Sequence, residues 1–289
     1  MRLLQGEEVN IGEIVLHHTA DAYSIDFAPF GHIAWHKWPD THIGGMVVNL
    51  TPTKHVVFMA IAALLVFLTM KLAGRSLARQ RAGENAPKGF AAAMEGLVLF
   101  VRNDIAIANI GPHDGKKFAP LIMTLFFFIL YMNLLGMIPF GASPTGNLAV
   151  TATLAILVFL TIEVGGFIKL GPKGYMRTIS PKVPGLGGAG GTVMSIAMAP
   201  IEIIGKLVKP FALAVRLFGN MTAGHFVILS LFGIVFLFGT LGVWSYAIAG
   251  VTVLLVVGIM LLELFVAFLQ AYVFALLSAV FIGLMQHEH

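Results

Sequence analysis

The stretch that decides the fold is LFGNMTAGHFVILSLFGIVFLFGTLGVWSYAIAGVTVLLVVGIMLL, residues 217–262, which contains no Lys, Arg, Asp or Glu. It is much longer than the roughly 20 apolar residues that cross a bilayer once as a helix. The whole chain fits the same environment, since 58% of its residues are hydrophobic and only 11% are charged. A soluble domain carries about 25% charged residues. We therefore predict an all-α integral membrane protein.

Composition also excludes several classes of function. Cysteine is absent, so the chain has no disulfide framework and no thiolate metal site. Its net charge of +4 is spread over loops, whereas a nucleic-acid-binding protein gathers basic residues in one patch or stripe. The sequence contains no GxxxxGK[ST] loop for a nucleotide. We expect no cofactor, no metal centre and no nucleic-acid partner.

Residues 1–53 are the only long polar segment, and they hold five histidines: His17, His18, His32, His36 and His42. We interpret this segment as solvated and extracytoplasmic. Metal binding is the alternative, because histidine-rich tracts can bind metal. The turn-forming residues around the histidines make this second interpretation the weaker one.

Residues 54–191 are predicted to contain three spanning helices, at 55–70, 118–135 and 148–168. A Gly- and Pro-rich turn at 136–147 separates the second span from the third. Near 89–110 we expect an amphipathic helix that lies in the membrane interface. Its apolar stripe consists of Phe90, Met94, Leu97, Val98 and Val101, and another face carries Glu95 and Arg102.

The loops 71–117 and 169–182 are basic. Because basic loops stay in the cytoplasm, the N-terminus is expected outside and the C-terminus inside.

Residues 192–289 are predicted to form two apolar helices of about 40 residues each, joined by a turn at 239–247. Forty helical residues extend about 60 Å, whereas the hydrocarbon core is only about 30 Å thick. Such helices must either kink or lie steeply tilted, and we predict a strongly tilted hairpin. The fold then has about five membrane-embedded helices and one interfacial helix.

Arg216 lies deep in this apolar region, where an arginine costs at least about 2.5–3.5 kcal/mol by insertion scales. Lys209 and Asn220 share its helical face, seven residues before it and four after it. Glu202 lies close to that face if the helix continues through Pro210. The structural alternative is that Arg216 snorkels toward Lys209.

His225 lies half a turn away from Arg216, whereas Glu263 and Gln270 share one face of the last helix. A lone buried glutamate needs a partner, and His225 can supply it in an antiparallel hairpin. Such a pair can pass a proton near neutral pH. The alternative is a purely structural hydrogen bond.

A guanidinium group stays charged at physiological pH, so Arg216 cannot itself relay protons. Its fixed charge would keep a nearby carboxylate ionised and would block direct proton passage. The pattern indicates a proton path with an electrostatic divider that acts on an acid from another subunit. The carboxylates of this chain within the apolar helices are Glu163, Glu202 and Glu263.

Four motifs resemble one known family: RLFGNMTAGH at 216–225, MNLLGMIP at 132–139, PTGNLAVTATLA at 144–155 and LQAYVFALLSAVFIG at 269–283. Together they are similar to the a subunits of F-type ATP synthases, the membrane stator beside the rotating c-ring. The resemblance covers most of the chain beyond about residue 45.

The resemblance implies that Arg216 faces the rotor carboxylate. Family members commonly carry an acid where this chain has His225 and a histidine where it has Glu263, so the two are exchanged here. Asn147 stands where some relatives have aspartate. The residues expected to serve proton translocation are Arg216, Asn220, His225, Glu263, Gln270, Glu202, Glu163 and Asn147.

The implied partners are the c-ring, the peripheral stalk of b subunits and the lipid bilayer of a bacterial inner membrane, with no catalytic site in this chain. The coupling ion is expected to be H⁺ rather than Na⁺, because His225 and Glu263 titrate and no oxygen-rich cage is visible. Two alternatives remain open at this point: a proton-coupled secondary transporter in which Arg216 binds an anion, and a structural membrane anchor. No internal repeat of the transporter kind is found.

Overall fold

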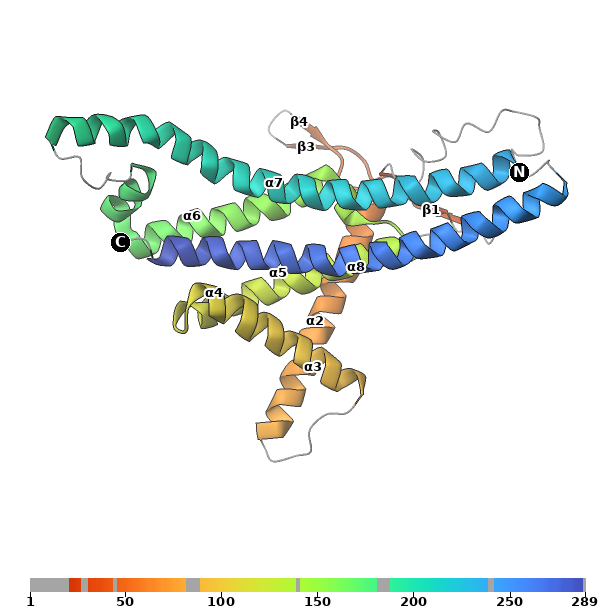
Figure 1. The fold of residues 1–289 in the computed structure, drawn as a ribbon, viewed down its shortest axis with the longest axis horizontal. Helices are drawn as coiled ribbons and strands as arrows, with labels where there is room; N and C mark the ends of the chain where they lie inside the picture. Colours follow the sequence, from red (N-terminus) through yellow and green to blue (C-terminus); the bar gives the residue numbers. More distant parts are fainter. Residues whose placement is uncertain are drawn as a thin grey trace. The chain divides into compact units, whose positions relative to one another are not determined.

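A computed structural model of the chain describes residues 21–26, 31–43, 46–81, 89–138, 141–180, 188–238 and 242–287. In this part of the chain, five helices are long and apolar enough to cross a membrane. They are labelled in Figure 1: α2 (Lys54–Arg81), α5 (Asp114–Met137), α6 (Leu148–Ile179), α7 (Gly188–Leu237) and α8 (Val243–His287). The predicted all-α membrane fold with five long helices is confirmed.

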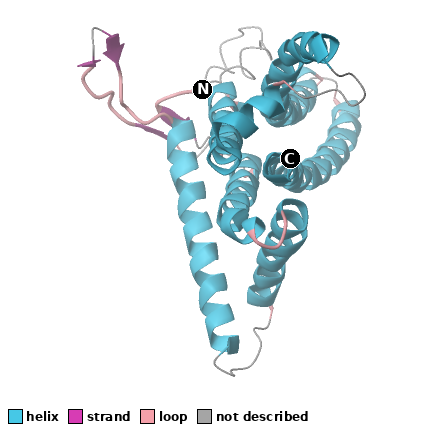
Figure 2. Ribbon diagram, turned by 90° about the vertical axis from the view of Figure 1, so that its left-hand side faces the viewer, coloured by secondary structure: helices cyan, strands magenta, loops and turns pink. Residues whose placement is uncertain are grey.

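The polar N-terminal segment contains two small hairpins, which the sequence did not predict. Strand β1 (Ser24–Asp26) pairs antiparallel with β2 (His32–Ala34), and β3 (Thr41–Ile43) pairs antiparallel with β4 (Met46–Val48). Each strand has three residues, and Figure 2 shows how little of the chain they occupy. The hairpins leave the helical class of the fold unchanged.

The N-terminal histidines form no metal cluster within the described residues. The side chains of His36 and His42 are exposed. His17 and His18 lie outside the part of the chain that the structure describes. The metal-binding alternative therefore gains no support from the histidines that can be placed.

The last two helices are longer than predicted, with 50 residues in α7 and 45 in α8. α7 continues through Pro200 and Pro210, which fulfils the condition for Glu202 to share a face with Arg216. The predicted turn at 239–247 was too long, because α8 already begins at Val243. At 1.5 Å per residue, α7 extends about 75 Å, so the argument for tilting becomes stronger, although the tilt itself remains a prediction.

The interfacial segment is helical over the predicted range. It begins with α3 (Phe90–Phe100), continues as the π-helix η2 (Val101–Ile107) and ends with α4 (Ala108–Ile110). In the predicted apolar stripe, Val98 and Val101 are buried, but Phe90 is 76% exposed. A π-helix inside an α-helix is rare, and no sequence signal indicated it.

Glu95, which the sequence places on a different face of this helix from the apolar stripe, is not exposed to solvent. Its side chain is buried, and one carboxylate oxygen accepts a hydrogen bond of 2.7 Å from the hydroxyl of Ser76 on α2. Burying a carboxylate is unfavourable unless it is hydrogen-bonded. Ser76 supplies that bond, and it could not be identified from spacing within the helix alone.

α6 bends where the third span was predicted to end. Gly171 has φ 67° and ψ 172°, outside the helical region, and Pro172 follows it. Glycine adopts positive φ without steric cost, and proline is favoured at the first position of a helix. The 32-residue α6 is thus two helical pieces joined at Gly171.

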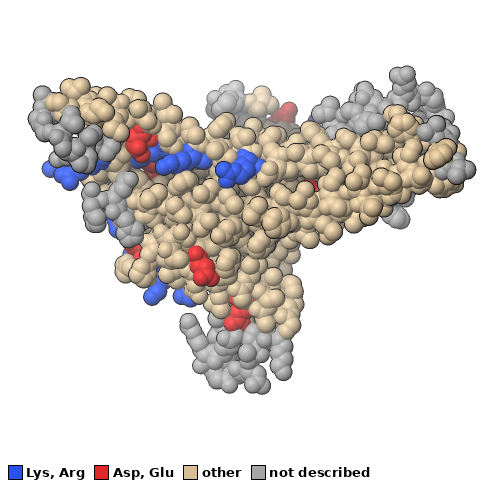
Figure 3. All heavy atoms as spheres, in the orientation of Figure 1, with Lys and Arg blue, Asp and Glu red and all other residues tan. Residues whose placement is uncertain are grey.

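The chain forms two compact units. The first consists of Met1–Leu64, Leu130–Asn147 and Phe218–Leu269, and the second of Leu65–Ile129, Leu148–Leu217 and Gln270–His289. The face drawn in Figure 3 is mostly uncharged, as expected for helices in contact with lipid.

Within the second unit, Gly283 of α8 lies against the backbone of the π-helical region. A Cβ atom at this position would collide with the carbonyl oxygen of Asn109 and would lie 3.3 Å from Cα of Ile110. Because backbone atoms cannot move aside cheaply, we expect Gly283→Ala to destabilise the protein by about 1–3 kcal/mol.

A lower thermal midpoint of the purified protein in detergent would show this effect. The matched variant is Gly74→Ala, because a Cβ atom there meets nothing within 4 Å. Equal midpoints for the two variants would contradict the close packing at Gly283.

Candidate functional site

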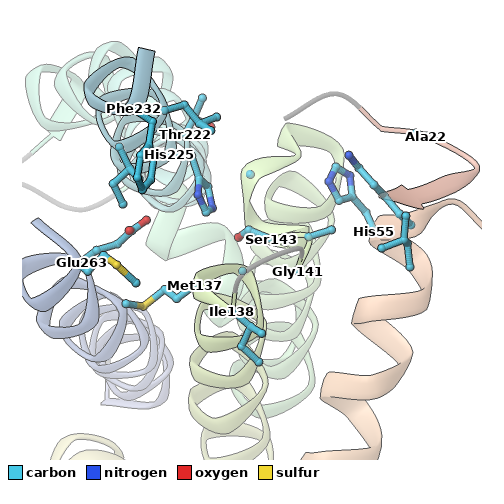
Figure 4. A pocket seen from close by; sticks show the side chains of 18 of the residues that line it. Ala22, His55, Met137, Ile138, Gly141, Ser143, Thr222, His225, Phe232 and Glu263 are labelled. Carbon is cyan, nitrogen blue, oxygen red and sulfur yellow. The ribbon is translucent and has the colours of Figure 1, made fainter. Parts of the chain in front are cut away.

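A cavity of about 320 Å³ lies in the first unit, and we call it the histidine cavity. Its polar lining comes from five elements: β1, α2, the loop after α5, α7 and α8. The main polar residues of the lining are Lys54, His55, Ser143, Thr222, His225 and Glu263. Figure 4 shows His225 and Glu263 projecting into this cavity from α7 and α8.

His225 and Glu263 therefore share one cavity, but they form no ion pair with each other. Nε2 of His225, Oε1 of Glu263 and Oγ1 of Thr222 are buried and have no hydrogen-bond partner among the described residues. Leaving such an atom without a partner costs about 1–3 kcal/mol. A polar cavity of this size admits water, which can bond all three atoms. The geometry therefore fits a His225–Glu263 pair that is connected through water molecules in the cavity.

A hydrogen-bonded network connects Ser143, in the wall of the histidine cavity, with α5 and α8. Asn133 of α5 is fully buried, and its Nδ2 donates to the carbonyl of Ala267 on α8 at 3.2 Å. The hydroxyl of Thr145 donates to Oδ1 of Asn133 at 2.7 Å and lies 2.9 Å from the hydroxyl of Ser143. This network fixes α5, the 141–147 loop and α8 to one another within the first unit.

Gly224 lets α7 approach α8 closely at Glu263. A Cβ atom on Gly224 would lie 2.6 Å from Oε1 and 3.0 Å from Cδ of Glu263. Small residues permit such approaches between membrane helices. The carboxylate of Glu263 therefore rests in a space that glycine leaves open.

The resemblance to a subunits of ATP synthases implies that Glu263 serves proton translocation. On that expectation, Gly224→Ala should reduce proton pumping by up to about tenfold, since a shift of about 1 Å in a reacting group can cost that much or more. Folding should be little affected, because the end of a flexible side chain can move aside. ATP-driven proton uptake by membrane vesicles measures the effect, with Gly74→Ala as control. Wild-type pumping by Gly224→Ala would show that the position of the Glu263 carboxylate does not matter.

A second cavity, of about 70 Å³, lies in the second unit, and we call it the lysine cavity. Glu163 of α6 and Glu202, Lys206 and Lys209 of α7 contribute to its lining. The structure thus brings together two of the carboxylates that the sequence singled out, Glu163 and Glu202. Lys209 also covers the ring of Phe281, with Nζ 5.1 Å from the ring centroid.

Glu163 is held by two neighbours in the lysine cavity. It accepts a hydrogen bond from the hydroxyl of Tyr175, and Nζ of Lys206 lies 3.9 Å from the same carboxylate oxygen. Lys206 also donates to the hydroxyl of Thr178 at 3.0 Å. The Lys206 and Glu163 side chains are only 11% and 15% exposed, so the pair is well shielded from solvent.

Arg216 and Asn220 lie on α7 with exposed side chains and line neither cavity. Arg216 forms no ion pair with any residue that the structure describes. Gln270 is buried in α8 and is absent from both linings. Asn147 lies beside the histidine cavity, where its Nδ2 is 3.4 Å from Nδ1 of His55.

Two residues that line the cavities, His55 and Lys206, were missed by the sequence analysis, as was one neighbour of the lysine cavity, Tyr175, which bonds Glu163. His55 and Lys206 carried a signal, because each is a polar residue at the edge of or inside an apolar run. Tyr175 carried none, since its contact with Glu163 depends on the bend of α6 at Gly171.

Comparison with known proteins gives a family for this architecture. The family described as ATP synthase A chain matches residues 44–283. The chain belongs to the ATP synthase A chain family. With its five apolar helices, this family member is a multi-pass membrane protein.

Individual relatives support the assignment. The chain is similar to ATP synthase subunit a 2 of Chlorobaculum tepidum, with 45% identity over 94% of this chain and 72% of that protein. It is 46% identical to ATP synthase subunit a of Chloroherpeton thalassium, over 94% of this chain and 77% of the relative. A third relative, ATP synthase subunit a of Anaeromyxobacter dehalogenans, is 42% identical over 96% and 71%.

Proposed function

We propose that this chain is the proton-translocating stator subunit of a membrane ATP synthase. It is a channel subunit of that enzyme and carries no catalytic site of its own. Family membership and the named relatives support this role over a secondary transporter or a structural anchor.

The main observation in support of the proposal is that the charge of Arg216 is exposed and has no ion-pair partner among the described residues. Its side chain is exposed on an apolar helix, and no described residue of the chain forms an ion pair with it. A cation within the membrane is costly unless it is paired. A carboxylate on another subunit, such as one on a rotating ring of helices, would satisfy this charge.

In this mechanism, each cavity serves as a half-channel to one side of the membrane. The histidine cavity would carry protons on the extracytoplasmic side, through His225 and Glu263. The lysine cavity would serve the cytoplasmic side, through Glu202 and Glu163. Arg216 keeps each arriving rotor carboxylate ionised, so that one proton must leave before another is loaded.

The nitrogen groups in the histidine cavity favour protons over sodium ions. Sodium is a hard cation that needs several oxygen ligands, as other hard cations do. The polar lining of the histidine cavity includes two imidazoles and one ammonium group, which are poor ligands for such an ion. Imidazoles instead exchange protons near neutral pH.

The remaining polar residues are assigned by their position along this route. Asn220 lies on the face of Arg216, and Gln270 lies on the face of Glu263, so both would line the path of the proton near the rotor. Asn147 would act through His55. We place the N-terminus outside and the C-terminus in the cytoplasm of a bacterium, as the distribution of basic loops indicates.

Purification in mild detergent tests the assignment to the complex. An affinity-tagged chain is expected to bring down a ring of small helical hairpins, a peripheral-stalk subunit and the catalytic sector. If the chain purifies alone from membranes in which the ring is intact, the stator function is wrong.

A further inference from the structure

His55 is a buried histidine in the wall of the histidine cavity, and the mechanism above mentions it only as the contact of Asn147. It is the second residue of α2, and its side chain is only 5% exposed. The backbone N–H of Lys54 donates to the carbonyl of Ala22 at 2.8 Å, which ties the N-terminal segment to the start of α2. Figure 4 shows His55 and Ala22 on the same side of the cavity.

Two different neighbours compete for the same ring nitrogen. Nδ1 of His55 lies 3.3 Å from Oδ1 of Asp21 and 3.4 Å from Nδ2 of Asn147. A neutral imidazole carries its proton on one nitrogen only. With the proton on Nδ1, the ring donates to Asp21, and without it, Nδ1 accepts from Asn147. The protein therefore stabilises both tautomers instead of selecting one.

Solvent exposure falls from Asp21 to His55, which lies between the surface and the cavity. The side chain of Asp21 is 33% exposed, whereas that of His55 is 5% exposed. His225 and Glu263 line the same cavity from α7 and α8. The other charged group in the wall is Lys54, which is buried. A histidine that only stabilises the fold needs one fixed hydrogen-bond partner. His55 instead lies between the partly exposed carboxylate of Asp21 and the polar residues of the histidine cavity.

We propose that His55 is a proton-relay residue of the histidine cavity, which passes protons between the Asp21 side and the water that reaches His225 and Glu263. This inference rests on the proposed function. One ring nitrogen takes a proton from a hydronium ion, which becomes water, and the ring becomes an imidazolium. The other nitrogen then gives its proton to a water molecule on the opposite side, which becomes a hydronium ion, and the ring is left as the second tautomer. No other atom and no electron is transferred. Because Nδ1 has a partner both with its proton (Asp21) and without it (Asn147), the ring can return to the first tautomer without losing a hydrogen bond.

The test uses the whole ATP synthase in inverted membrane vesicles. His55→Gln keeps a donor and an acceptor in place but cannot titrate. We expect it to lower ATP-driven proton pumping about tenfold, less than the roughly 100-fold effect of removing a required proton-transfer group, because water can bypass part of the route. His113→Ala is the control, since the side chain of His113 is 82% exposed and lies in the other unit. ATP hydrolysis in detergent reports whether each variant assembles.

Added imidazole separates a relay from a structural role. We expect imidazole in the medium to restore at least half of the pumping that His55→Ala loses, since the cavity has room for a small base beside the missing ring. Pumping by His55→Gln within twofold of the wild type would overturn the proposal. If His55→Ala loses pumping and added imidazole does not restore it, the proposal is also overturned. If His55→Ala does not assemble, the pumping rate of His55→Gln alone decides.

An Arg216→Ala arm in the same vesicles separates this inference from the proposed function. If Arg216→Ala abolishes pumping but His55→Gln does not reduce it, only the relay is wrong. If Arg216→Ala pumps normally, the proposed function fails as well.

Discussion

Arg216→Lys will abolish ATP synthesis, although it keeps a positive charge at the position. Lysine loses the planar fork and the five donors of the guanidinium group. Its ammonium charge is compact and strongly hydrated, so it is poorly suited to face a carboxylate within the membrane. We expect synthesis to fall at least about 100-fold, the scale seen when a preorganised charge-stabilising group is removed from a reaction site.

ATP synthesis driven by an imposed proton gradient in inverted vesicles measures this loss. The matched control is Arg75→Lys, because Arg75 is an exposed arginine on α2 that the account gives no role. It should leave synthesis unchanged. If Arg216→Lys synthesises ATP at near the wild-type rate, only the charge of Arg216 matters and the geometric part of the account is wrong.

Exchanging His225 and Glu263 is expected to preserve more proton flux than either single change. Each single replacement, His225→Glu or Glu263→His, leaves two like groups at positions 225 and 263, where the native chain has one imidazole and one carboxylate in the histidine cavity. The double variant restores an acid and an imidazole. A coupling of about 1.4 kcal/mol, within the range for residues that act together, corresponds to about tenfold more flux than the product of the single losses.

This double-mutant comparison needs a control pair of residues whose effects on proton flux are independent. His113→Ala combined with Glu263→His provides it, because the two residues belong to different units and share no described contact. Their effects should combine without an interaction term. If the His225 and Glu263 effects combine in the same independent way, the two residues do not function as a pair.

The spanning helices could be predicted from sequence because burial in lipid imposes a simple rule. Every backbone group must be bonded within its own helix, so long apolar runs such as residues 217–262 have only one stable form. Polar segments are under no such constraint. The hairpins β1–β2 and β3–β4 carried no clear alternating pattern and were not predicted.

The candidate site was only partly predictable, for a related reason. Spacing along one helix placed Asn220 on the face of Arg216 and His225 on another, because helical geometry is regular. Contacts between distant segments have no such periodicity. The approach of Asp21 to His55, and of Ser76 to Glu95, depends on how α2 meets its neighbours, and spacing contains no information about that.

The passive proton conductance of Arg216→Ala tests the central claim most directly. Vesicles stripped of the catalytic sector are loaded with a potassium gradient, and valinomycin then drives protons through the membrane sector alone. If the fixed charge of Arg216 separates two half-channels, Arg216→Ala should leak protons faster than the wild type and fail to pump when the catalytic sector is restored. Coupled pumping by Arg216→Ala at near the wild-type rate, without an added leak, would show that the arginine is structural and would contradict the account.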